Sequence, residues 1–173
     1  MFDWHLYVLQ HPMTPYGGVF LAGVGLCIAL GAILSRIRGI LVGIGFALGA
    51  LLITIFGTQL ARGLHPPTIL QVGSLTLAIV LEIAGFRFLM PIIRPRGERA
   101  TLGATMGIVG LHFFVMIPAF GLLIGALGLS CTLNAAAFWR LSGYRAGVAW
   151  FVDGCLKLVF GLAMLSTSPI FRG

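Results

Sequence analysis

The sequence predicts an all-α, polytopic integral membrane protein with six transmembrane helices and both termini outside the cell. Three observations support this fold class. The 173 residues are 59% hydrophobic and only 9% charged, with a mean hydropathy of +1.07, whereas soluble domains are about a quarter charged. Long apolar runs follow one another with few polar residues between them. The arginines gather in short clusters beside these runs, which is typical of loops at a membrane surface.

Residues 1–16 are predicted to form an interfacial segment that lies on the membrane. Trp4, Tyr7 and Tyr16 stand among polar residues and prolines, and amphipathic rings settle at the level of the lipid headgroups. The segment has no basic stretch before an apolar one and carries Asp3, so we do not expect a cleavable signal peptide. Residues 17–173 are predicted to form a single six-helix transmembrane domain.

Breaks between the apolar runs divide the chain into six spans of about 20 residues, the length that crosses a bilayer. Pro66 and Pro67 mark one turn, because a proline does not easily continue a helix. Residues 101–139 contain no charged residue and would make a helix of about 58 Å, so we expect Pro118 to divide them. The predicted spans are residues 17–34, 39–61, 68–91, 101–117, 119–139 and 146–165.

The charges of the predicted loops set the orientation. In a six-span chain alternate loops lie on the same side, and the side with more lysine and arginine is cytoplasmic. Arg62 and Arg172 fall on one side. The other side has Arg36, Arg38, Arg94, Arg96, Arg99, Arg140 and Arg145. The termini are therefore expected outside, with the protein in the plasma (inner) membrane of a prokaryote.

Two predicted spans carry charged residues within their apolar length. Glu82 and Arg87 lie in the third span, and Asp153 and Lys157 lie in the sixth, close enough to pair within one helix. An ionised residue at the bilayer centre costs about 2.5–3.5 kcal/mol on insertion scales. We therefore expect the third and sixth spans to meet and neutralise these groups, with Glu82 beside Lys157 and Asp153 beside Arg87.

The buried charges have three interpretations. They form an inert network that fixes the register of the helices, or they contact a partner subunit, or they line a polar pathway for a proton, an ion or a small solute. Ionisable groups that face a bundle interior mark such pathways in many membrane proteins. In that case Glu82 and Asp153 are the proton or cation acceptors, and Lys157 and Arg87 are their counter-charges.

Three of the polar residues without a permanent charge within the spans are also candidate site residues: His112, Gln71 and Asn134. His112 is the only histidine inside a predicted span, so one chain cannot form a bis-histidine haem site. It is expected to be hydrogen-bonded or to face water, to relay protons, or to bind a haem or pigment, and no other cofactor is indicated. Gln71 and Asn134 are expected to make helix-to-helix hydrogen bonds or to contact a substrate.

Many of the 25 glycines have a spacing that favours helix contact. Small residues four apart let helix backbones approach closely in a membrane, either within the bundle or between two copies of the chain. In the sixth span Gly147, Gly154 and Gly161 recur every seven residues. The pairs four apart are Gly39 and Gly43, Gly45 and Gly49, Gly103 and Gly107, and Gly121 and Gly125.

The two halves of the chain echo each other weakly. Residues 24–27 resemble residues 109–112, and Leu81 and Glu82 resemble Val152 and Asp153. Three spans in each half would give a 3+3 inverted repeat, as in many transporters. Chance similarity between apolar helices is the competing explanation.

The leading functional hypothesis is proton- or ion-linked transport, or permeation of a small solute, through a charged site between the third and sixth spans. The alternative is a non-transporting accessory or assembly subunit of a larger membrane complex or homo-oligomer, with or without pigment or haem. No H-E-x-x-H, G-x-S-x-G or phosphate-loop motif supports an enzyme. The basic loop of Arg94, Arg96 and Arg99 indicates topology or anionic-lipid binding, and no nucleic acid is expected.

Overall fold

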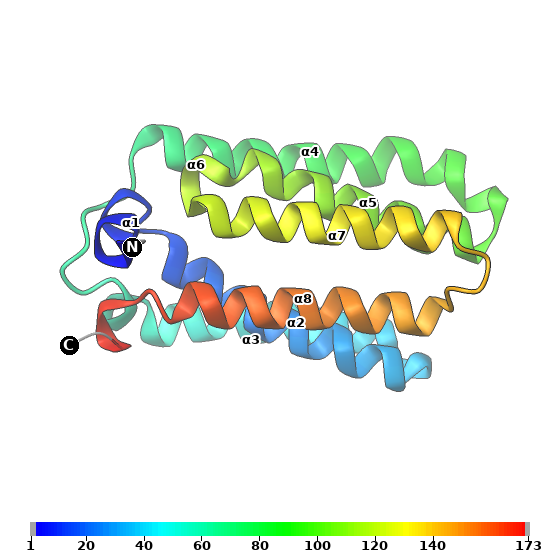
Figure 1. Ribbon diagram of the computed structural model, residues 1–173, viewed down its shortest axis with the longest axis horizontal. Helices are drawn as coiled ribbons and strands as arrows, with labels where there is room; N and C mark the ends of the chain where they lie inside the picture. Colours follow the sequence, from blue (N-terminus) through cyan, green and yellow to red (C-terminus); the bar gives the residue numbers. More distant parts are fainter. Residues whose placement is uncertain (1–2, 172–173) are drawn as a thin grey trace.

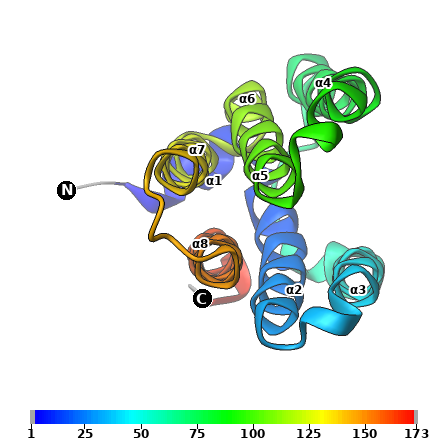
Figure 2. The same ribbon diagram turned by 90° about the vertical axis from the view of Figure 1, so that its right-hand side faces the viewer.

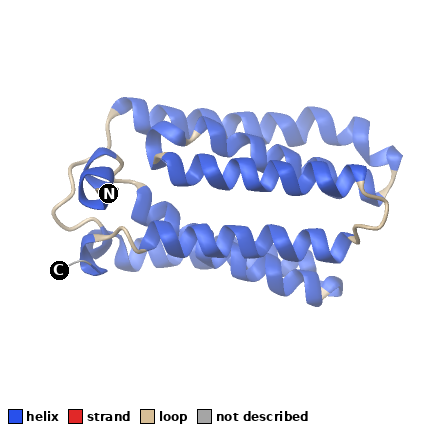
Figure 3. Cartoon of the chain, in the orientation of Figure 1, coloured by secondary structure: helices blue, strands red, loops and turns tan. Residues whose placement is uncertain are grey.

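The computed structural model describes residues 3–171, and every regular element in that range is helical (Figure 3). The prediction of an all-α fold is therefore confirmed. Arg172, which was counted among the loop charges, lies outside the described residues. The long helices are α2 (Thr14–Ile33), α3 (Arg38–Leu60), α4 (Ile69–Ile93), α5 (Glu98–Val115), α7 (Leu122–Arg140) and α8 (Ala146–Leu165). The short ones are α1 (Trp4–Gln10), α6 (Ile117–Phe120) and the 3₁₀ turns η1 (Ser35–Ile37), η2 (Arg94–Arg96) and η3 (Pro169–Phe171).

Five of these helices, α2, α3, α4, α7 and α8, are long and apolar enough to cross a membrane. The remaining long helix, α5, was expected to begin at residue 101. It begins earlier, at Glu98, because Gly97 provides a helix start with a φ of 98°. Glu98 and Arg99 are therefore part of an 18-residue helix, and these two charges lower its mean hydropathy.

Two prolines affect the helix ends differently from the prediction. Pro91 was expected to end its span, but α4 continues through it to Ile93. The ring tolerates the helical φ and, in the last turn, removes only one backbone hydrogen bond. Pro118 stands in the first turn of the short helix α6, where its missing N–H is not needed. The chain reverses at Gly121, whose φ of 75° favours glycine.

The long helices form two layers of three (Figures 1 and 2). One layer contains α4, α5 and α7 with α5 in the middle, and the other contains α3, α2 and α8 with α2 in the middle. The packing of α7 against α8 joins the layers along one side. On the opposite side α3 and α4 have no extensive contact. This difference leaves space between the layers on the α3–α4 side.

The glycine stripe of α8 brings this helix very close to α2. A Cβ atom added to Gly154 would lie 2.4 Å from the backbone N of Ala29, and one added to Gly161 would lie 2.5 Å from the backbone N of Ala22. Gly25 of α2 approaches the backbone of α8 equally closely. In contrast, Gly39 and Gly43 of α3 would meet no atom within 4 Å in the described chain. Only part of the glycine pattern is therefore used for packing inside the chain.

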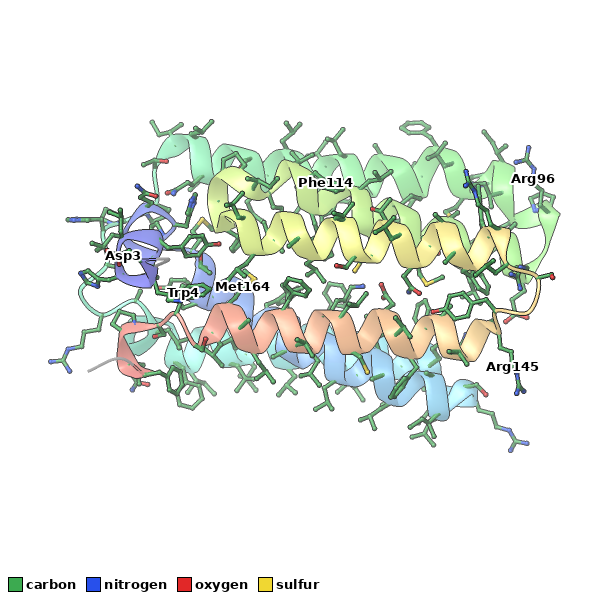
Figure 4. All side chains as sticks on the ribbon, in the orientation of Figure 1. Asp3, Trp4, Arg96, Phe114, Arg145 and Met164 are labelled. Atoms are coloured by element: carbon green, nitrogen blue, oxygen red, sulfur yellow. The ribbon has the colours of Figure 1, made fainter. Side chains whose placement is uncertain are left out.

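The helix α1 is folded onto one end of the bundle, and η3 lies at the same end (Figure 1). Its side chain Tyr7 is buried, donates a hydrogen bond to the Phe120 carbonyl at 2.7 Å and accepts one from the Leu123 N–H at 3.2 Å. Burial raises the pKa of the Tyr7 phenol above its usual value. Arg96 and Arg145 lie at the opposite end from Asp3 and Trp4 (Figure 4). The bundle therefore has an arginine-rich end and an end that carries α1.

Candidate functional site

A cavity of about 1060 Å³ lies between the two layers. Side chains of α2 to α8 line it, together with the turn that joins α3 to α4. The wall is mostly apolar, which is typical of binding sites for small molecules. The ionisable side chains that line it include His65 of the turn, Tyr16 of α2 and four candidates from the sequence on three helices: Glu82, His112, Asp153 and Lys157.

Asp153 and Lys157 form an ion pair on α8. Their positions, four residues apart, place them one turn from each other on the same helix face, and the Lys157 Nζ donates to Asp153 Oδ2 at 2.5 Å. Both side chains are almost completely buried. The same ammonium lies 3.9 Å from Cys131 Sγ of α7 and 5.9 Å from the centre of the Phe113 ring of α5. The charge of Lys157 is therefore neutralised within its own helix.

Glu82 of α4 faces His112 of α5. The distance from Glu82 Oε2 to His112 Nε2 is 3.6 Å, and the Glu82 side chain is 24% exposed whereas that of His112 is 7% exposed. Imidazole carries a positive charge only when it is protonated. Within residues 3–171, Glu82 thus forms no ion pair with a lysine or an arginine, whose positive charge would be permanent.

The predicted charge pairs are wrong. Asp153 pairs with Lys157, and Arg87 is exposed on α4, away from the cavity. Glu82 and Arg87 are five positions apart, so their side chains leave the helix about 140° apart and cannot both face the cavity. The expected packing of the third predicted span against the sixth is also absent, because α4 packs on α5 and not on α8. These helices face each other only across the cavity.

Gln71 and Asn134 lie outside this cavity and hydrogen-bond between segments. Gln71 belongs to the capping box of α4 with Thr68, and its Nε2 donates to the Gln10 carbonyl at 2.7 Å. Asn134 of α7 donates from Nδ2 to the Ala149 carbonyl of α8 at 2.9 Å. Its Oδ1 accepts from the Tyr144 hydroxyl at 2.7 Å. Both side chains therefore connect two helices through hydrogen bonds.

Removing the amide of Asn134 is expected to weaken the contact of α7 with α8. We expect Asn134→Ala to lower the free energy of unfolding by about 0.6–1.7 kcal/mol, which runs from the average to the largest value measured for hydrogen bonds between membrane helices in double-mutant cycles. Ser130→Ala on the same helix is the matched control, because the exposed Ser130 hydroxyl bonds only to the Ala126 carbonyl of its own helix. Unfolding in mixed micelles with increasing dodecyl sulfate would measure both. Equal midpoints for the two variants would contradict the role given to Asn134.

Trp150 is a site residue that the sequence did not single out. It lies on α8 one turn before Asp153 and lines the cavity. Its indole Nε1 and the Oδ1 of Asp153 are both buried without a hydrogen-bond partner in the described part of the chain. The guanidinium of Arg38 lies 5.3 Å from the Trp150 ring centre. In the sequence, only the three-residue spacing indicated that Trp150 and Asp153 lie on the same helix face. A tryptophan at such a position usually packs against a neighbouring helix and has no functional role.

The all-helical fold, five helices able to cross a membrane by length and composition, and a cavity with buried ionisable groups together have the character of a polytopic helical membrane protein. The chain belongs to the family of unknown function DUF6609, whose model matches residues 7–172. No curated protein and no solved structure is significantly similar to it. The family description states no activity, so the function has to be inferred from the cavity itself.

Proposed function

We propose that this protein mediates proton-linked transport or permeation of a small solute, with the interlayer cavity as its pathway and Glu82 as its proton acceptor. The observation that carries the proposal is the convergence of Glu82, His112, Asp153 and Lys157, from three different helices, on one cavity of about 1060 Å³. Ionisable side chains are rare in membrane helices and mark pathways when they face an interior space.

The two charged pairs suit different roles. Glu82 and His112 are 3.6 Å apart, and both the carboxylate and the imidazole can bind a proton. Asp153 and Lys157 neutralise each other at 2.5 Å, so they supply a fixed polar group beside the pathway. The sequence suggested Glu82 and Asp153 as proton acceptors, and we now propose this role for Glu82 alone.

A topology of six spans with both termini outside accompanies this proposal. It takes α5 as the span that hydropathy alone does not identify, since α5 lies between α4 and α7 in its layer (Figure 2). The arginine-rich end is then cytoplasmic in a prokaryotic plasma membrane. The first half of the chain contains α2, α3 and α4, and the second half contains α5, α7 and α8. In each layer, the first two helices of one half pack with the third helix of the other half. This exchange supports a 3+3 inverted repeat with α2 and α5 as equivalent central helices.

Proton flux into liposomes tests the proposal. Vesicles that contain the purified protein and a trapped pH dye should acidify faster than empty vesicles when a potassium diffusion potential drives protons inward. We expect Glu82→Gln to slow this flux at least about tenfold, because positioned proton-transfer groups accelerate the steps they serve by about 100-fold or more. Arg87→Gln is the matched control, since Arg87 is exposed on the same helix. Equal flux through both variants would contradict the proposal.

The second candidate function is that of a subunit in a larger membrane assembly, and the outer faces of α3 and α4 favour it. They expose large apolar side chains such as Ile44 and Ile83, and a Cβ on Gly39 or Gly43 would meet nothing within 4 Å in residues 3–171. A neighbouring helix, from a second copy or another subunit, would approach closely there. A single monomeric species after extraction in a mild detergent, without bound pigment or haem absorbance, would contradict this candidate.

Anionic lipid is a further proposed partner at the arginine-rich end. Arg94 and Arg96 are exposed and free to meet headgroups. The guanidinium of Arg99 instead donates to the carbonyls of Phe138, Leu141 and Tyr144, at the end of α7 and in the following loop. We therefore assign the lipid contact to Arg94 and Arg96 and a structural role to Arg99.

A further inference from the structure

We propose that the cavity binds a lipophilic organic cation, which enters from the bilayer between α3 and α4 and replaces the proton on Glu82. The inference rests on the proposed function and names the substrate class of the same site. The charges of the cavity, the composition of its wall and the position of its open side support it independently.

The charge balance of the cavity favours a cation. Asp153 and Lys157 cancel each other, and His112 is uncharged unless it takes up a proton. His65, in the turn between α3 and α4, also lines the cavity, and the Arg38 guanidinium lies outside the lining, 5.3 Å from the Trp150 ring centre. Among the lining groups, Glu82 therefore leaves one excess negative charge when it is ionised and both imidazoles are neutral. Asp153 Oδ1 has no hydrogen-bond partner among the described residues and is available to accept from a ligand. A positively charged ligand would compensate Glu82 without disturbing the ion pair on α8.

The wall of the cavity suits a bulky organic cation. Aromatic rings stabilise positive charge within about 6 Å of their faces, and ligand-binding pockets of about 300–1000 Å³ hold drug-sized molecules. The volume here is about 1060 Å³. Aromatic side chains from six helices line it: Phe20, Phe46, Phe86, Phe113, Phe120 and Trp150. Two rings of the lining, those of Phe113 and Trp150, already lie near the cationic groups of Lys157 and Arg38.

The open side of the cavity faces the region of the lipid. Phe46 of α3 and Ile79 of α4 both line the cavity, yet they are 49% and 44% exposed. They stand on the two helices that have no extensive contact with each other, on the side of the bundle away from α7 and α8 (Figure 2). The adjoining outer surfaces are apolar. A ligand dissolved in the bilayer would thus reach Glu82 without crossing a polar surface.

A lipophilic anion is the competing ligand, and the structure disfavours it. Lys157 is the only lysine of the chain, its side chain is 3% exposed, and its ammonium is bound to Asp153. An anion would have to separate this pair and would approach Glu82 as well. The negative charges of the anion and of ionised Glu82 would repel each other strongly at short range in a medium of low dielectric constant.

Two probes of nearly the same size and shape but opposite charge test the inference. Tetraphenylphosphonium and tetraphenylborate would each be titrated into the purified full-length protein in dodecyl maltoside by isothermal calorimetry. We expect the cation to bind at least about tenfold more tightly, which corresponds to about 1.4 kcal/mol. In weakly buffered solution, cation binding should release protons and should weaken as the pH is lowered. Glu82→Gln should remove the preference for the cation, whereas Arg87→Gln should keep it.

The results separate this inference from the proposed function. Equal binding of the two probes, tighter binding of the borate, or a cation preference that survives Glu82→Gln would overturn the inference. Liposome proton flux that depends on Glu82 would leave the proposed function standing in that case. Conversely, Glu82-dependent cation binding with unchanged flux in Glu82→Gln would support the ligand class and overturn transport. Gel filtration and Glu82→Asp, which restores the carboxylate, would show that any loss is not a folding defect.

Discussion

Gly154→Ala is expected to lower the free energy of unfolding by about 3 kcal/mol, the upper part of the range for adding a methyl group to a tightly packed interior. The new Cβ would lie 2.4 Å from the backbone N of Ala29, 2.8 Å from its Cα and 2.9 Å from the carbonyl oxygen of Gly25. These are all backbone atoms of α2, so no side chain can rotate away. The two helices would have to separate along their whole contact.

Gly43→Ala provides the matched control for this prediction. Gly43 lies within α3, and a Cβ there would meet nothing within 4 Å among the described residues. Alanine is favoured over glycine in a helix by about 1 kcal/mol, so the variant should be as stable as the natural protein or more so. Thermal unfolding in detergent, followed by circular dichroism, would compare the two. If Gly154→Ala melted at the same temperature as Gly43→Ala, the close contact of α2 with α8 would be wrong.

The effect of this substitution would extend to the cavity. Gly154 follows Asp153 directly. The glycines of α8 pack against α2, and this contact sets the position of Asp153 and Lys157 in the cavity. A displacement of α8 would therefore move the ion pair relative to Glu82 and His112. Reduced proton flux in Gly154→Ala would follow from this displacement even though glycine has no ionisable group.

The helices themselves were largely predictable from the sequence, because the residues at their ends determine where they begin and end. The predicted span 146–165 has the same bounds as α8, since charged residues precede it and polar residues follow it. Thr68 and Gln71 form the capping box that starts α4. The rule that a proline ends a helix failed at Pro91. In the last turn a proline removes only one backbone hydrogen bond, and α4 continues through it to Ile93.

The arrangement of the helices was less accessible, because every span is apolar on all sides. A helix of a soluble protein shows its buried face by the alternation of polar and apolar residues, whereas here the lipid-facing surfaces of α3 and α4 are as apolar as the core. The contact of Glu82 with His112 joins residues 30 positions apart and follows only from the packing of α4 on α5. The exposure of Arg87 was predictable, since its helical angle from Glu82 was fixed by the sequence.

Replacing either member of the ion pair on α8 alone is expected to be strongly destabilising. Lys157→Met leaves a buried carboxylate without a partner, and Asp153→Leu leaves a buried ammonium. We expect each to lower the free energy of unfolding by about 3–5 kcal/mol. The double variant, Asp153→Leu with Lys157→Met, should lose much less than the sum, because an apolar pair of similar volume can replace a buried ion pair at little net change. Unfolding by dodecyl sulfate titration would supply the four free energies of this cycle.

Arg87→Met controls for the loss of a positive charge from an exposed position and should change stability by about 0.5 kcal/mol or less. Additive losses in the cycle would show that Asp153 and Lys157 do not depend on each other, contrary to their 2.5 Å contact. The double variant also separates the interpretations of the buried charges. If it folds and keeps its proton flux, the pair on α8 fixes the position of a helix, and the proton pathway requires Glu82 and His112 alone. If it folds but conducts no protons, the fixed charges of α8 are part of the pathway.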